Sequence, residues 1–103
     1  MSNADLKFMF ARPVVTACFS AETKEEKIAA VSASMQDFMS FSYAVEYGDA
    51  GDADDQKQIA KNAAELAPTL VAMEAEGEEA MLKAVYGYQQ QWSDFLKSSE
   101  LSD

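Results

Sequence analysis

The chain has 103 residues, enough for one domain and too few for two. It carries 18 Asp and Glu residues against 8 Lys and Arg residues, with one cysteine and no histidine, for a net charge of −10. Within this chain, those counts exclude an intrachain disulfide, a histidine-based catalytic triad and a Cys/His zinc site. The excess of acidic residues also argues against direct binding to nucleic acid, because phosphate contacts need a basic face.

The apolar runs are too short for a membrane protein. None approaches the roughly 20 residues of a membrane span, and Arg12 and Pro13 interrupt the segment that could resemble a signal peptide. Cys18 follows Val14-Val15-Thr16-Ala17 and is expected to be a buried, reduced thiol. We therefore expect a cytoplasmic protein that does not bind membranes.

The first apolar segment, residues 6–19, is rich in β-branched and aromatic residues, which favour extended backbone. Pro13 divides it into two short pieces, and a lone strand or hairpin is marginal without a sheet to join. We expect residues 1–21 to form an extended or irregular arm on a helical core. A short helix after Pro13 is the alternative.

A helix is predicted over residues 22–47. Thr23 and Glu26 have the spacing of a capping box, and the glutamates nearby suit the positive end of a helix. Apolar side chains then recur every three or four residues and so share one face. They are Ile28, Val31, Met35, Phe38 and Val45, with Met39 widening the stripe and Ser42 interrupting it. Gly48 suits the left-handed position just past a helix end.

The remaining residues predict a long, kinked helix. It begins near residue 54, where Asp52 or Asp54 can cap it. Pro68 is unfavourable inside a helix but fits the first turn of one. Because apolar residues continue in phase from Leu66 to Phe95, we expect a kink or very short joint at Pro68 and a helix end near Lys97.

The sequence thus predicts an all-α fold, a small bundle of two to three helices. The helix at 22–47 would pack antiparallel to the long kinked helix, with the arm at 1–21, a helical domain at 22–97 and a flexible tail at 98–103. Two or three helices enclose only a small core, and the pairing of two copies into a four-helix bundle would enlarge it.

No arrangement of residues predicts catalysis or a cofactor. The acidic loop at 48–55 does not match a calcium-binding EF-hand loop in either register. Serine, threonine and cysteine have no histidine to act as their base, and Gly48 and Gly51 lack the Lys-Ser/Thr of a phosphate-binding loop. Glutamate pairs one helical turn apart leave a magnesium-dependent helical hydrolase as a minor hypothesis.

Aromatic and acidic residues are the most distinctive feature. Residues 46–79 hold ten acidic residues and two lysines. Aromatic side chains gather near both predicted helix ends, and such residues are enriched at the centres of interfaces. The candidate partner-binding residues are Phe41, Tyr43, Tyr47, Tyr86, Trp92, Glu74, Glu76, Glu78 and Glu79.

The sequence favours a non-enzymatic protein-binding module over an enzyme. It would act as a small acidic adaptor, an assembly or secretion chaperone or an inhibitor, and its protein partner would present a basic surface. The alternative is an acidic antagonist that mimics nucleic acid and occupies a basic nucleic-acid-binding protein, as some phage-encoded proteins do.

Overall fold

The computed structural model describes residues 3–48 and 51–101, and its regular elements are all helical. In chain order they are α1 (Asn3–Ser20), α2 (Lys24–Tyr47), α3 (Ala53–Ala72), the short 3-10 helix η1 (Glu74–Glu76) and α4 (Glu78–Leu101). No strand occurs in the described ranges. The prediction of a small all-α bundle is confirmed, but the described residues form four α-helices instead of two or three.

The N-terminal segment is a helix, so the predicted extended arm is wrong. α1 continues through Pro13 and packs against α2 and α4. It buries one side, formed by Ala11, Val14, Val15 and Cys18, while Pro13 lies on the exposed side. Burial of this face outweighs the extended preference of the β-branched residues and the backbone hydrogen bond that Pro13 cannot make.

α2 agrees with the predicted helix at both ends. The Thr23 hydroxyl oxygen accepts a hydrogen bond from the Glu26 backbone N–H at 3.1 Å. Gly48 follows the last helical residue with a φ of 82°, a left-handed conformation that glycine adopts without strain. The buried residues of α2 are Val31, Met35, Phe38, Met39, Ser42 and Tyr43. Ser42 therefore belongs to the buried face that it was expected to interrupt.

The C-terminal half contains two helices instead of one kinked helix. α3 begins with a capping box, in which the Asp52 side chain accepts from the Asp55 N–H at 2.9 Å. It then passes through Pro68 without interruption. The chain turns at η1 and Gly77, whose φ of 100° and ψ of 168° lie in a region that is essentially restricted to glycine. In-phase apolar residues on either side of this turn produced the wrong prediction.

The end of the chain also differs from the prediction. α4 extends to Leu101, beyond the expected helix end near Lys97. The predicted flexible tail at 98–103 therefore starts inside a helix, and its residues 102–103 lie outside the described residues.

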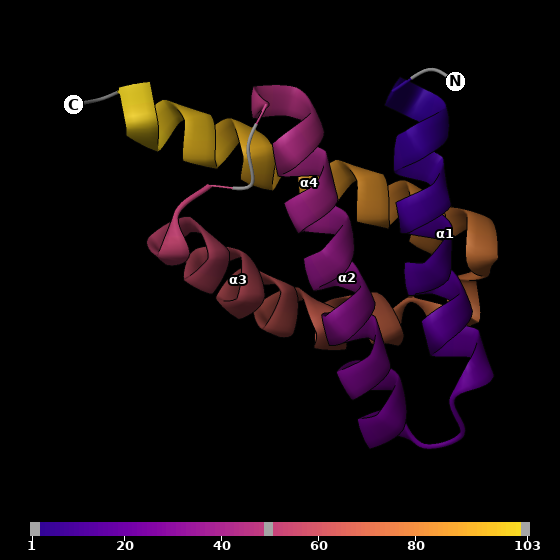
Figure 1. Ribbon diagram of the computed structural model, residues 1–103. Helices are drawn as coiled ribbons and strands as arrows, with labels where there is room; N and C mark the ends of the chain where they lie inside the picture. The colour runs from indigo at the N-terminus through magenta and orange to yellow at the C-terminus, as the bar shows by residue number, and fades with distance from the viewer. Residues whose placement is uncertain (1–2, 49–50, 102–103) are drawn as a thin grey trace.

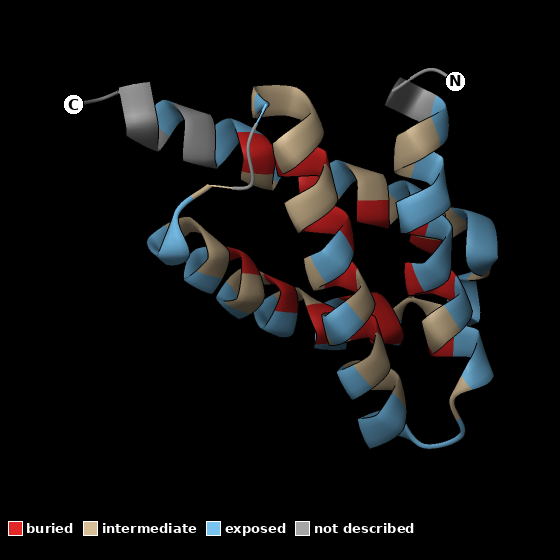
Figure 2. Cartoon of the chain, in the orientation of Figure 1, coloured by how far each residue is buried: buried red, intermediate tan, exposed pale blue. Residues whose placement is uncertain are grey.

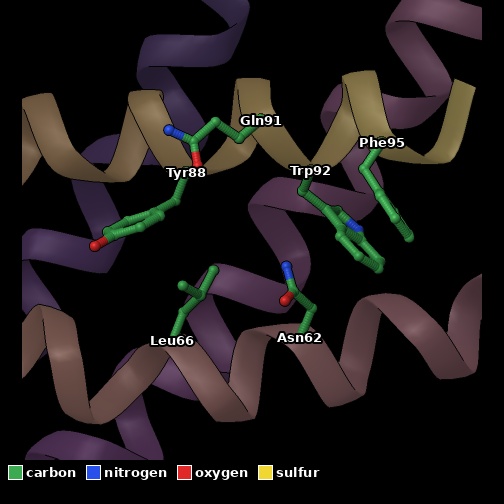
Figure 3. Close-up of a pocket in the computed structure, with 6 residues that line it drawn as sticks. All are labelled: Asn62, Leu66, Tyr88, Gln91, Trp92 and Phe95. Atoms are coloured by element: carbon green, nitrogen blue, oxygen red, sulfur yellow. The ribbon is translucent and has the colours of Figure 1, made fainter. Parts of the chain in front are cut away.

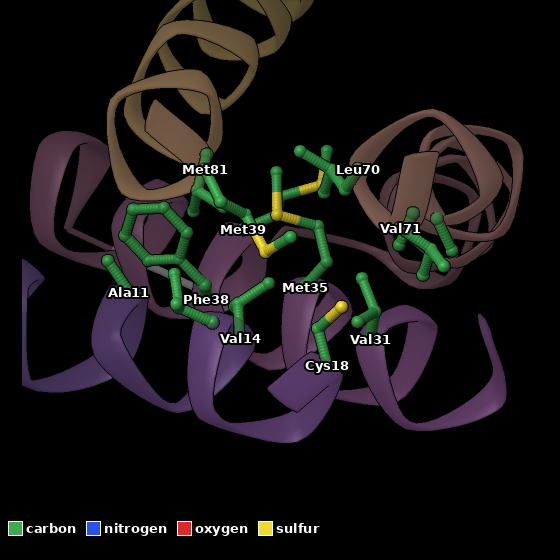
Figure 4. Close-up of a cluster of buried hydrophobic side chains, with 14 of the residues drawn as sticks. Ala11, Val14, Cys18, Val31, Met35, Phe38, Met39, Leu70, Val71 and Met81 are labelled. Carbon is green, nitrogen blue, oxygen red and sulfur yellow. The ribbon is translucent and has the colours of Figure 1, made fainter. Parts of the chain in front are cut away.

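All four α-helices contribute to a single core. Figure 1 shows α1 and α2 side by side as a helical hairpin that α3 and α4 cross. Figure 2 shows the buried residues on the sides of the helices that face one another. In Figure 4, Ala11 and Val14 of α1 lie near Phe38 of α2, and Met81 of α4 lies above Phe38. Cys18 of α1 lies near Val31 and Met35 of α2 in the same view. None of the described helices combines the length and the apolar character that a membrane crossing requires.

α2 is the central helix of the bundle. It packs extensively on both α1 and α3, whereas α3 and α4 make few contacts with each other. Lys7 near the start of α1 pairs with Glu46 near the end of α2 at 2.6 Å, a contact between the far ends of two antiparallel helices. The sparse packing between α3 and α4 leaves room for the candidate site.

Candidate protein-binding site

An open apolar groove lies between α3 and α4, with a volume of about 330 Å³. Its lining residues are Asn62 and Leu66 from α3 and Tyr88, Gln91, Trp92 and Phe95 from α4. Figure 3 shows the two helices running antiparallel on opposite sides of the groove, with Leu66 and Asn62 directed towards α4 and Trp92 and Phe95 directed towards α3. A neighbouring hollow shares Tyr88 and Gln91 and extends the concave surface towards Met73 and Gly87.

The buried side of α4 explains why its aromatic side chains line the groove. Met81, Val85, Gln89 and Ser93 are buried at intervals of four residues. Gln89 Nε2 donates to Ser93 Oγ at 2.8 Å, so these buried polar groups satisfy each other. The Tyr47 hydroxyl donates to the Ser93 carbonyl at 3.1 Å and attaches this part of α4 to α2. Tyr88, Trp92 and Phe95 lie beside this buried line and are available to the groove.

Trp92 and Phe95 form a stacked aromatic pair at one end of the groove. Their ring centroids are 5.4 Å apart with an interplanar angle of 17°. Phe95 is 60% exposed, the highest value among the exposed large hydrophobic residues of the described chain. The indole Nε1 of Trp92 is buried and has no hydrogen-bond acceptor within the described structure. The pair therefore presents exposed aromatic surface, mainly that of Phe95, at the groove.

The other predicted aromatic residues mainly support the fold. Phe41 stacks on Phe10 of α1 at 4.0 Å between centroids, and Tyr43 is buried. Tyr47 packs edge-on against Tyr43 at 4.8 Å. Of the five predicted aromatic residues, Trp92 is the one that lines the α3–α4 groove.

Tyr86 belongs to a different part of the surface. Its ring packs edge-on against the buried Phe38 at 5.8 Å, and burial raises the pKa of its hydroxyl. Together with Glu79, Leu82 and Lys83 it lines a separate open hollow of about 550 Å³. Two of the predicted site residues, Tyr86 and Glu79, thus line the same hollow, and this hollow is separate from the groove that Trp92 lines.

The four predicted glutamates separate into two pairs. Glu74 pairs with Lys27 at 3.0 Å, and Glu78 pairs with Arg12 at 3.7 Å. Glu76 and Glu79 are exposed and form no ion pair with a described residue. Two of the four carboxylates are thus engaged within the chain, and two are available to a partner.

Glu74 also belongs to a cluster that joins three elements. Lys27 Nζ donates to the Cys18 carbonyl at 2.7 Å, and the Cys18 thiol lies 3.5 Å from Glu74 Oε2. The hydrogen bond from Lys27 lowers the pKa of Glu74. The pKa of Cys18 is raised first by burial and second by the hydrogen bond to Glu74. The raised pKa keeps the thiol protonated and unreactive. This cluster stabilises the end of α1 and offers no activated nucleophile.

The exposure of Phe95 does not follow from the sequence, because this residue continues the apolar stripe that begins at Leu66. The true buried line of α4 includes Gln89 and Ser93. Because these residues are polar, hydropathy did not reveal that line. Reasoning from sequence also missed the exposed Phe8, Met9 and Phe19 of α1, since that segment was not expected to be helical.

No known protein family, curated protein or solved structure matches this chain. Within the described residues, no group of three or more acidic or cysteine side chains is arranged to hold a metal ion. The interpretation of the site therefore depends on its own geometry.

Proposed function

We propose that the chain is a non-enzymatic protein-binding module that holds an apolar segment of a basic partner in the α3–α4 groove. The observation that carries this proposal is the Trp92–Phe95 pair, which presents stacked aromatic surface at an open apolar groove. Tryptophan and other aromatic side chains supply much of the binding energy at protein interfaces.

The charge of the chain supports a basic partner. The chain carries a net charge of −10, and exposed Glu65 and Asp94 directly precede the groove residues Leu66 and Phe95 in sequence. Carboxylates beside an apolar contact speed the approach of a cationic surface and disfavour acidic competitors.

The proposal can be tested by affinity capture from the native host with three forms of the chain as bait. These are the wild type, Phe95→Ala and the control Met9→Ala, which removes a comparably exposed apolar side chain from α1. Truncation of an exposed residue leaves the core intact, so loss of binding is not loss of fold. We expect one protein to be captured by the wild type and the control, and at least about tenfold less of it by Phe95→Ala. Equal capture by all three forms would count against the groove.

An acidic antagonist of a nucleic-acid-binding protein is the second candidate, favoured by the exposed Glu76 and Glu79. On this hypothesis, DNA or RNA would compete with the chain for its partner, and Glu76→Lys with Glu79→Lys would abolish binding. Glu74 and Glu78 are less suitable test positions, because they are paired with Lys27 and Arg12. Binding that survives the double substitution and ignores nucleic acid would leave the groove as the better account.

A further inference from the structure

The walls of the α3–α4 groove are helices, and this limits what the groove can hold. Its lining residues lie inside α3 and α4, where the backbone N–H and C=O groups bond within each helix. The groove is therefore lined by side chains, and Asn62, Gln91 and Tyr88 contribute its hydrogen-bonding groups. A bound segment must satisfy most of its own backbone hydrogen bonds, because a buried backbone group without a partner is costly. An α-helix does this within a single segment.

The concave surface also repeats at a helical spacing. α4 contributes Tyr88, Gln91, Trp92 and Phe95 to the groove, and Ala84, Gly87, Tyr88 and Gln91 to the neighbouring hollow. The second set is the first set displaced by four residues, which is about 6 Å along the helix axis. Side chains at positions i and i+4 of a helix lie on one face at about the same separation. A helix laid along α4 therefore places one side chain in each concavity.

We propose that the segment held by the groove is an amphipathic α-helix of the partner, with apolar anchors at i and i+4 and basic residues along its edges. This inference rests on the proposed function and specifies the segment that the groove binds. One anchor contacts Leu66, Trp92 and Phe95, and the other contacts Met73 and Tyr88 in the neighbouring hollow. An amphipathic helix seated in an apolar groove is a recurring mode of peptide recognition.

Carboxylates flank the groove on both walls. Glu65 of α3 and Asp94 of α4 are exposed and adjoin lining residues in the sequence. Neither forms an ion pair with a described residue, and Asp94 Oδ1 accepts a hydrogen bond from Gln90 Nε2 at 3.1 Å. Residues 61–66 and 88–95 contain these two carboxylates and one lysine, Lys61. Together with the net charge of −10, this excess favours lysine or arginine on the edges of the bound helix.

A pair of synthetic peptides tests the helical segment. The first is a tryptophan-free peptide of about 18 residues with leucine at helical spacing and lysine elsewhere, long enough to form a helix. The second has the same length and charge but carries a proline near its centre, which breaks the helix. Each peptide is titrated into the chain while the fluorescence of Trp92, the single tryptophan, is recorded. The wild type is compared with Phe95→Ala and with Met9→Ala, which removes an exposed apolar side chain of α1.

We expect saturable binding of the helical peptide to the wild type and to Met9→Ala. Binding should be at least about tenfold weaker for the proline peptide, and also for Phe95→Ala. Equal binding of both peptides that Phe95→Ala still weakens would overturn the helical segment and leave the proposed function standing. Failure of both peptides to bind, or binding that Phe95→Ala does not weaken, would also overturn the helical segment. In that case, capture of a partner that depends on Phe95 would still support the groove itself.

The flanking carboxylates provide a second test of the basic edges. Glu65→Gln combined with Asp94→Asn should weaken binding of the helical peptide about threefold or more, because two exposed ion pairs are lost. The control combination Asp37→Asn with Glu79→Gln removes the same charge from exposed residues that do not line the groove, and it should weaken binding less. Equal weakening by the two combinations would overturn the placement of basic residues beside Glu65 and Asp94.

Discussion

At the scale of single residues, one carboxylate stabilises the junction of α1, α2 and η1. Glu74 accepts from Lys27 Nζ, which also donates to the last turn of α1 through the Cys18 carbonyl. Lys27 lowers the pKa of Glu74 from its ordinary value of 4.5. Because the pKa is lowered in the folded state, the pair stabilises the fold above the unfolded-state pKa. That stabilisation is lost as the pH falls through the folded-state pKa.

Replacement of the lysine should therefore change the pH dependence of stability. We expect Lys27→Met to be less stable than the wild type at neutral pH, because its ion pair with Glu74 is lost. Between neutral pH and about pH 3, the free energy of unfolding should then fall less for Lys27→Met than for the wild type. Urea unfolding followed by circular dichroism across this range measures the difference. Lys24→Met, which changes an exposed lysine on the same helix, should keep the wild-type dependence. If the free energy of unfolding changes equally with pH in Lys27→Met and the wild type, the Lys27–Glu74 pair contributes nothing to the pH dependence of stability.

The residues of the candidate site differ in how far the sequence alone predicts them. The sequence identified Trp92 as a candidate, because an aromatic residue near the end of an amphipathic helix is a frequent interface anchor. It did not identify Phe95, because the exposure of this residue depends on how α4 packs on α1 and α2. That placement follows in part from the buried Gln89–Ser93 hydrogen bond, which no hydropathy pattern can reveal.

At the scale of elements, the helix ends were more predictable than the division of the chain into helices. Thr23, Gly48 and Asp52 act through local backbone geometry, so their roles are visible in the sequence alone. α1 and the separation of α3 from α4 depend on tertiary packing. The residues around Val14 and Cys18 prefer extended backbone, but their burial against the other helices stabilises them as a helix. Gly77 adopts the backbone conformation at which the chain turns between α3 and α4.

Two glycines in the C-terminal half should respond oppositely to the same substitution. Gly77→Ala forces a side chain into a backbone conformation with φ of 100° and should destabilise the fold by about 1–3 kcal/mol. Gly87→Ala introduces a methyl group into open space within α4 and should stabilise the fold by about 0.5–1 kcal/mol. Urea unfolding of both variants measures the two changes. Stabilisation by Gly77→Ala would mean that α3 and α4 are one continuous helix.

At the scale of the whole molecule, the net charge of −10 should govern how a basic partner binds. The attraction between the chain and such a partner is screened by salt, so added salt should slow association and weaken binding. Partner titration at low and moderate salt measures this change. Binding that is equally tight at both salt concentrations would show that the charge of the chain does not contribute to recognition.

The single tryptophan of the chain lines the α3–α4 groove and is therefore a direct reporter of a partner bound there. The decisive measurement is a titration of the captured partner, or of its tryptophan-free binding segment, into the chain while Trp92 fluorescence is recorded. We predict a shift of the emission with saturable binding, and binding at least about tenfold weaker for Phe95→Ala. Saturable binding by another method that leaves Trp92 emission unchanged and ignores Phe95→Ala would contradict binding in the groove.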